Sequence, residues 1–369
     1  MSGKSVSAGP RRSTGHLQPR ILLACAAVAA GAGLWGGFGR LGWSLPVGDL
    51  AGLHGPLLIC GLFGIVIGVE RAVAFGRPYG FLAPVLSATG TLLLLGGTAA
   101  TYAAAFYTGS AATLTVVTTA IAAAQPALFT ATLVIAALAW LVGNAMWWLG
   151  SSVPDVSGWW LAFLVLTIGA ERLELSRVLP PRRGAAALFV AAAILLVAGA
   201  AVGINDETGR VVFGAALLAL SAWLARHDIA TRNIRRTGQA RFMAACMLAG
   251  YGWLAVAGAV LMANTGATFA FGYDVTLHAV LIGFVLSMVF GHALIIVPAV
   301  ARTNLSYSPL LYLPLVLLHL SVAMRVASGL VELHGGRMAS GMVTGLALAT
   351  FVAILSRSAT KQAGPALRT

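Results

Sequence analysis

Apolar runs of about twenty residues recur along almost the whole chain, from Ile21 to Leu355. Each run is rich in Leu, Ala, Val and Gly, and is long enough to cross a hydrocarbon core of about 30 Å as an α-helix. Backbone polar groups in lipid have to satisfy one another, so repeated runs of this length form helices. The sequence therefore predicts an all-α fold, a polytopic bundle of transmembrane helices.

The composition argues against a soluble domain and against a nucleic-acid partner. Of the 369 residues, 59% are hydrophobic and 9% are charged, whereas soluble domains carry about 25% charged residues. The net charge of +13 comes from Lys and Arg in short loops and tails, so we interpret it as a topology signal. The three cysteines lie inside apolar runs without CxxC spacing, and we expect them to be buried and unpaired.

Polar and basic breaks divide the apolar stretch into twelve expected spans. The break at Gln125-Pro126 is typical of a helix start, because proline fits well in the first turn. No clean small-residue cleavage site follows the first run, so we expect an uncleaved span there. The expected spans are 21–38, 50–74, 80–98, 102–124, 127–149, 157–178, 184–203, 210–226, 240–263, 273–301, 309–330 and 337–357.

The basic residues predict the orientation of the chain. With twelve spans and both tails on one side, that side receives most of the arginines, and the positive-inside rule makes it cytoplasmic. We therefore expect a basic cytoplasmic tail at 1–20, a transmembrane domain at 21–357 and a second cytoplasmic tail at 358–369. The membrane expected is an inner (plasma) membrane of the bacterial type, and the lipid bilayer is the predicted partner.

Four histidines inside the expected spans are the strongest functional signal. Ionisable groups at such depth are rare and are functional candidates by default. The four are His54, His278, His292 and His319. The other three, His16, His227 and His334, fall in tail or loop segments where we expect them to be solvated.

The first two histidines are expected near the outer ends of their helices. His54 follows Asp49 by five residues and His278 follows Asp274 by four. At 1.5 Å per residue, both lie about 6–8 Å below the outer end of a span. His54 and His278 are therefore predicted to share one level of the bilayer.

The other two histidines are expected deeper in the bilayer. His292 precedes Arg302 by ten residues and His319 follows Pro309 by ten, which places both about 15 Å from the inner ends. His278 and His292 are fourteen residues apart on one span, so they point to nearly the same side at levels about 21 Å apart. Two layers of paired imidazoles would suit axial ligation of haem, while interhelical hydrogen bonding or a proton or ion pathway remain alternatives.

Two short segments echo each other at the inner ends of their helices. They are Gly68-Val-Glu-Arg71 and Gly169-Ala-Glu-Arg172. We interpret them as interfacial ion-pair anchors. The alternative is a proton-entry role for Glu70 or Glu171.

Two segments around the first histidine pair resemble the NnrS family of membrane haem- and copper-containing proteins. They are Leu53-His54-Gly55-Pro56, followed by Gly64 and Gly68, and Leu277-His278-Ala279-Val280-Leu281-Ile282-Gly283-Phe284. That family is associated with nitric-oxide tolerance and is similar to the catalytic subunit of haem–copper oxidases. The resemblance implies twelve spans and assigns His54 and His278 as axial ligands of a low-spin haem. The sixth and seventh spans hold no histidine, so oxidase-type dioxygen reduction is not expected.

The functional hypothesis is a haem-binding membrane redox protein, in electron transfer or in handling nitric oxide and respiratory stress, with a redox partner protein. His54 and His278 would hold an outer b-type haem, and His292 and His319 a second haem or a copper ion. Arg325, about 9 Å along its helix from His319, would pair with a propionate. The alternative is a transporter, a proton or metal conduit, or an assembly factor without a permanent cofactor.

Overall fold

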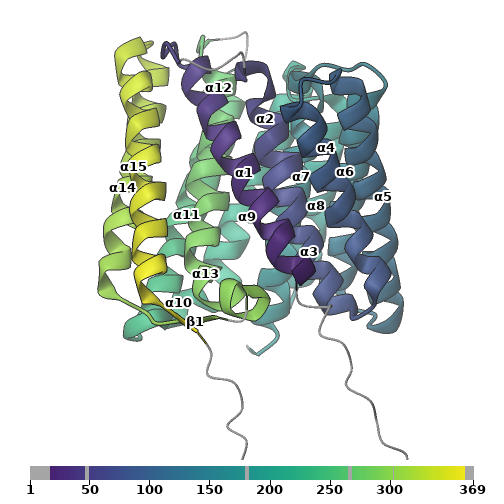
Figure 1. The fold of residues 1–369 in the computed structure, drawn as a ribbon. Coiled ribbons are helices and arrows are strands. Elements are labelled where there is room, and N and C mark those ends of the chain that lie inside the picture. Colours follow the sequence, from purple (N-terminus) through teal and green to yellow (C-terminus); the bar gives the residue numbers. More distant parts are fainter. Residues whose placement is uncertain (1–16, 46–49, 179–182, 265–267, 302, 362–369) are drawn as a thin grey trace, which may run out of the picture.

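The structure is a computed structural model and describes residues 17–45, 50–178, 183–264, 268–301 and 303–361. Its helices run side by side in one bundle (Figure 1). Twelve described segments are long and apolar enough to cross a membrane. The prediction of an all-α, multi-pass transmembrane bundle is therefore confirmed. His16, Asp49, Arg302 and most of both expected tails lie outside the described residues.

Most spans consist of one long helix. Two begin with a short 3₁₀ turn at a proline, which is tolerated there because a first turn leaves its N–H groups without an intrahelical acceptor. These two are η4 (Pro78–Phe81) before α4 (Leu82–Leu95), and η7 (Pro309–Leu311) before α14 (Tyr312–Leu330). The others are α1 (Leu17–Arg40), α5 (Ala100–Ala124), α6 (Leu128–Trp148), α7 (Val153–Ser176), α8 (Ala185–Val202), α9 (Glu207–His227), α11 (Gly238–Ala263) and α15 (His334–Ser358).

The second and tenth spans are built differently, because each contains a stretch of π-helix. The second runs through η2 (Ala51–Leu53), α2 (His54–Pro56), the π-helical η3 (Leu57–Phe63) and α3 (Gly64–Phe75). The tenth runs through α12 (Gly272–His278), the π-helical η6 (Ala279–Leu286) and α13 (Ser287–Ala301). π-Helical turns are rare and occur frequently at functional sites. His54 and His278 each stand just before such a stretch.

Short connections close the bundle at the end where α1 begins and α15 ends (Figure 1). The short helix α10 (Ala230–Asn233) links α9 to α11. Strands β1 (Thr303–Leu305) and β2 (Ala359–Lys361) pair antiparallel, with Leu305 opposite Ala359. This pairing ties the connection between α13 and α14 to the end of α15.

Arginines are distributed unequally between the two ends of the bundle. The end that holds the start of α1 carries Arg71, Arg77, Arg177, Arg226, Arg232, Arg235, Arg236, Arg241 and Arg357. The opposite end carries Arg40, Arg210, Arg325 and Arg337. We call the first the inner end and the second the outer end, in keeping with the positive-inside prediction.

Helix α7 lies at the centre of the bundle, while α14 and α15 pack against each other at one side (Figure 1). In the apolar part of α7, 72% of the residues are buried, against 22% for α15. Asn144 of α6 satisfies several polar groups in this interior. Its Oδ1 accepts from Cys60 Sγ at 3.2 Å and from Trp160 Nε1 at 3.0 Å, and its Nδ2 donates to the Tyr107 carbonyl at 3.3 Å. All three cysteines are free; Cys60 and Cys246 are buried as expected, whereas Cys25 is partly exposed.

Candidate functional site

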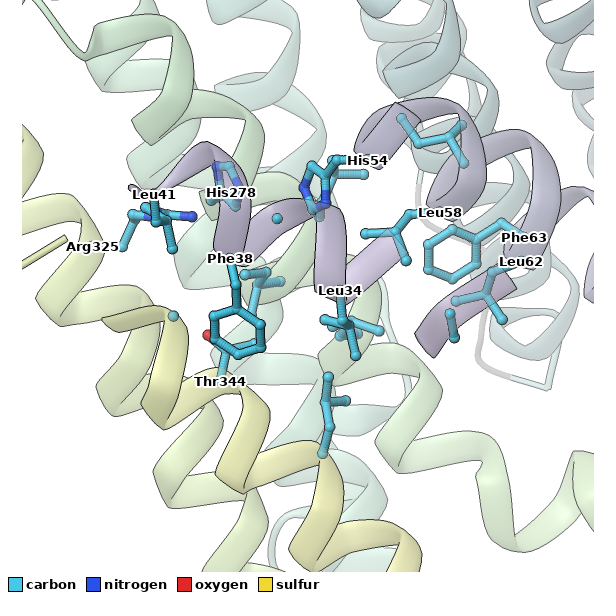
Figure 2. A pocket seen from close by; sticks show the side chains of 18 residues that line it. Leu34, Phe38, Leu41, His54, Leu58, Leu62, Phe63, His278, Arg325 and Thr344 are labelled. Carbon is cyan, nitrogen blue, oxygen red and sulfur yellow. The ribbon is translucent and has the colours of Figure 1, made fainter. Parts of the chain in front are cut away.

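The rings of His54 and His278 lie next to each other, although 224 positions separate them in the chain. Their centroids are 6.2 Å apart and their planes differ by 15°. Figure 2 shows the two rings at one level, facing a pocket. The structure therefore brings together the two histidines predicted to share the outer layer.

Both rings are held through the same nitrogen. His54 Nδ1 lies 2.7 Å from the carbonyl oxygen of Gly33, and His278 Nδ1 lies 2.7 Å from that of Asp274. A carbonyl can only accept, so each Nδ1 carries the proton and donates it. In a neutral imidazole this leaves the Nε2 lone pair free, which is the form of histidine that binds metals.

Helix α1 approaches His54 closely because glycines form its contact face. Gly33 supplies the carbonyl that holds the ring, and Gly37 lies one helical turn further on. A Cβ on Gly37 would stand 2.8 Å from both Cε1 and Nδ1 of His54. The ring position therefore depends on the absence of a side chain at residue 37.

An apolar chamber extends from the two rings toward the middle of the bundle (Figure 2). Its volume is about 860 Å³, counting its open side. Binding pockets for small molecules and cofactors are mostly apolar, as this chamber is. The chamber lies between α1, η3, η6 and α15, and its apolar lining includes Leu34, Leu58, Leu62, Phe63, Leu281, Leu286 and Leu348.

A polar vestibule adjoins this chamber at the outer end and shares His54, His278 and Arg325 with it. Its volume is about 1230 Å³, counting open space. The charged groups that line it are Arg40, Asp274, Arg325 and Arg337. Among the described residues, three cations and one anion give this lining a net charge of +2, which favours a dianionic occupant.

Asp274 is held by two of these arginines. Its Oδ2 lies 3.3 Å from Arg337 Nη2 and 3.7 Å from Arg325 Nε. Both arginines are buried, with 8% and 6% of their surface exposed. Arg325 therefore lies in the outer site with His278.

His292 has protein partners on both nitrogens. Its Nδ1 donates to the Met288 carbonyl at 2.7 Å, and its Nε2 accepts from Arg172 Nη2 at 2.7 Å. Arg172 is 2% exposed and also contacts Met247 Sδ at 3.3 Å. Nearby, in the connection after α9, burial raises the pKa of the Asp228 carboxyl, and the charge of Arg172 acts in the opposite direction. His292 thus serves a buried hydrogen-bond network.

His319 also has its own partners. Trp253 Nε1 donates to His319 Nδ1 at 3.0 Å, and Ser287 Oγ lies 3.5 Å from His319 Nε2. Ser287 and His292 are five residues apart on α13, so their side chains differ in direction by about 140°. His319 therefore faces a different side of α13 from His292, and these contacts do not support the predicted inner pair.

The described part of the chain holds no group of three or more His, Cys, Asp or Glu side chains that could bind a metal ion. The described residues therefore offer no ligand cluster for a copper ion bound only by protein side chains. A haem iron asks less of the protein, because the porphyrin supplies four nitrogens and the protein supplies only the axial ligands. Two histidines are enough.

The two echoing segments meet at the inner end. Arg71 Nη2 lies 2.5 Å from Glu70 Oε1 and 3.3 Å from Glu171 Oε1. These contacts support their interpretation as ion-pair anchors. Arg172, the last residue of the second segment, points into the core toward His292 instead.

Several residues of the site had no functional assignment from sequence. Gly33 and Gly37 looked like ordinary small residues of a membrane helix, and Arg40 and Arg337 counted only as outer-side charges. The sequence nevertheless held a signal for the two arginines. Arg40 ends α1 and Arg337 opens α15, so both were expected at the outer end, where His54 and His278 were placed.

The fold and the site define a polytopic all-α membrane protein with a histidine- and arginine-lined hollow at one end. The model of the family described as a domain of unknown function (DUF8744) matches residues 20–360, and the chain belongs to that family. No curated protein and no solved structure matches the chain.

Proposed function

We propose that this protein binds one b-type haem between His54 and His278 and carries electrons in the membrane. The observation that carries the proposal is the separation of the two rings. A metal–imidazole bond is about 2 Å long and the ring centroid lies about 1 Å beyond the nitrogen, so two opposed ligands place their centroids about 6 Å apart. The observed separation is 6.2 Å.

The chemistry of the donor atoms also fits a haem. Both rings present Nε2 as the unprotonated nitrogen, because their Nδ1 atoms donate to backbone carbonyls. Such a hydrogen bond fixes the tautomer and the direction of a metal-binding histidine.

The two cavities beside the histidines match the apolar and the charged parts of haem. Haem has an apolar macrocycle and two carboxylates on one edge. The apolar chamber and the polar vestibule meet at the two histidines, and Arg40, Arg325 and Arg337 line the vestibule. Guanidinium groups are strong partners for carboxylates. The vestibule would therefore receive the propionates near the outer end of the bundle.

Ligation by two histidines supports electron transfer over other uses of a haem. An iron with both axial positions filled by protein has none left for a small molecule such as nitric oxide. A role in nitric-oxide or respiratory stress, which resemblance to the NnrS family implies, would then consist of supplying electrons. The donor or acceptor would be a redox partner protein at the outer face of a bacterial-type inner membrane.

The decisive experiment is an optical spectrum of the protein purified from haem-replete cells. The proposal expects a Soret band, sharp low-spin bands on reduction, and about one b-type haem per chain by pyridine haemochrome assay. Absence of a Soret band from folded protein would refute it.

A pair of variants assigns the ligand. His54→Ala should lose the haem, while His334→Ala, at the exposed start of α15, should keep it. Equal haem content in both variants would remove His54 from the site even if the protein binds haem elsewhere.

A further inference from the structure

The two imidazoles of the outer site are held by unequal partners. His54 Nδ1 has a backbone carbonyl, that of Gly33, at 2.7 Å. His278 Nδ1 has a backbone carbonyl at the same distance and, in addition, the carboxylate oxygen Oδ1 of Asp274 at 3.2 Å. Among the described residues, a full negative charge therefore stands next to the His278 ring and none next to the His54 ring.

This carboxylate is fixed in place. Asp274 Oδ1 faces the ring, while Oδ2 lies 3.3 Å from Arg337 and 3.7 Å from Arg325. Arg337 is itself held over the Phe271 ring, 3.6 Å from its centroid. Among the described residues that line the vestibule, Asp274 is also the only carboxylate. Its direction is thus set by groups that contact neither ring.

We infer that Asp274 is a positioning residue that sets the reduction potential of the haem through His278. The inference rests on the proposed function. A carboxylate that accepts from Nδ1–H makes the imidazole a stronger electron donor at Nε2. Its negative charge also favours the more positive, ferric state of the iron, since the interior has a low effective dielectric constant. Both effects lower the potential.

The test compares Asp274→Asn with Asp274→Glu by optical redox titration of the haem-loaded protein. Asparagine keeps the backbone carbonyl but removes the charge, so the ferric-to-ferrous ratio at a fixed ambient potential should fall about tenfold, equal to 59 mV for a one-electron couple. Glutamate keeps the charge but places it one methylene further out, so the ratio should fall measurably, though by less than with asparagine. Haem content should remain near that of the unmodified protein in both variants.

A matched control separates this effect from the general removal of an outer-end carboxylate. Asp155 lies at the start of α7, bonded to Ser152 and Asn205, and does not line the vestibule. Asp155→Asn should leave the potential unchanged. A haem-loaded Asp274→Asn protein with the same potential as Asp155→Asn would overturn the inference while leaving the haem site standing. Absence of haem from the unmodified protein would instead overturn the proposed function, and the inference with it.

If Asp274→Asn does not accumulate, the glutamate variant and the ferric electron paramagnetic resonance (EPR) spectrum decide. Moving the carboxylate should weaken the hydrogen bond from His278 Nδ1, make the imidazole a weaker donor to the iron and widen the spread of g values. Identical EPR spectra and potentials for Asp274→Glu and the unmodified protein would contradict the assigned role.

Discussion

The outer and inner histidine pairs differ in how their nitrogens are used. At the outer end, His54 and His278 each direct Nδ1 to a backbone carbonyl and leave Nε2 free, with the rings 6.2 Å apart. Deeper in the bundle, His292 donates to Met288 and accepts from Arg172, and His319 contacts Trp253 and Ser287. Among the described contacts, the rings of the first pair use only Nδ1, whereas the rings of the second pair contact protein through both nitrogens.

The comparison shows that two side chains at the same depth in the bilayer need not contact each other. Both pairs were expected to match in height. In the outer pair, a π-helical stretch follows each histidine, glycines let α1 approach His54, and the two rings meet. The inner pair diverges because His292 faces α7, about 140° around α13 from the face that His319 contacts. Rotation about the helix axis decides which neighbour a side chain meets.

The largest effect is expected from two variants on the tenth span, each of which removes one histidine of a different pair. His278→Ala should reduce haem per chain at least tenfold, which requires a loss of only about 1.4 kcal/mol. His292→Ala removes the same side chain fourteen residues further along and should keep the haem. Measured by pyridine haemochrome assay, haem loss from His292→Ala but not from His278→Ala would invert the assignment of the two pairs.

A second prediction concerns the vestibule arginines. Arg337→Gln should weaken haem binding to the apoprotein about tenfold, as expected for one charge-assisted hydrogen bond of about 1.5 kcal/mol. Haem dimethyl ester, whose carboxylates are masked, should bind the variant and the unmodified protein alike.

The control is Arg210→Gln, at the same outer end but bonded to the Asn205 carbonyl outside the vestibule. It should bind both porphyrins normally. An equal fall in affinity for haem and for its ester in Arg337→Gln would mean that Arg337 has a structural role only.

A third prediction sharpens the role of the close approach of α1. Gly37→Ala adds a Cβ at 2.8 Å from the His54 ring and should displace it, at a cost of about 1 kcal/mol or roughly fivefold in haem affinity. Gly31→Ala, on the same helix, meets nothing within 4 Å and should have no effect. Haem titration of the two apoproteins checks this, and equal affinities would show that the ring tolerates the contact.

The smallest effect is expected at the inner network. His292→Ala leaves the buried Arg172 Nη2 without its acceptor and should destabilise the protein by about 1 kcal/mol, as is typical of side-chain hydrogen bonds inside membranes. Thermal unfolding in detergent, followed by circular dichroism, measures it. A stability unchanged from the unmodified protein would show that the Arg172 contact is not maintained.

Sequence alone predicted much of the fold, because the apolar runs and the arginine pattern act locally along the chain. The twelve spans agree with the expected ranges, and His54 and His278, predicted at one level from Asp49 and Asp274, lie next to each other. The roles of Gly33 and Gly37 could not be predicted, since the sequence does not show which side chain packs against a glycine. The histidine that Arg325 lies near could not be predicted, because spacing along one helix does not show which helix stands opposite.

The most direct test of the central claim is the EPR spectrum of the ferric protein. Two axial imidazoles with nearly parallel planes, as the 15° angle between His54 and His278 requires, give a rhombic low-spin spectrum. Perpendicular planes give instead a single feature at high g value, and one missing ligand gives a high-spin signal. A rhombic low-spin spectrum that disappears in His54→Ala and in His278→Ala is the result predicted. A high-spin spectrum from the unmodified protein would contradict ligation by this pair.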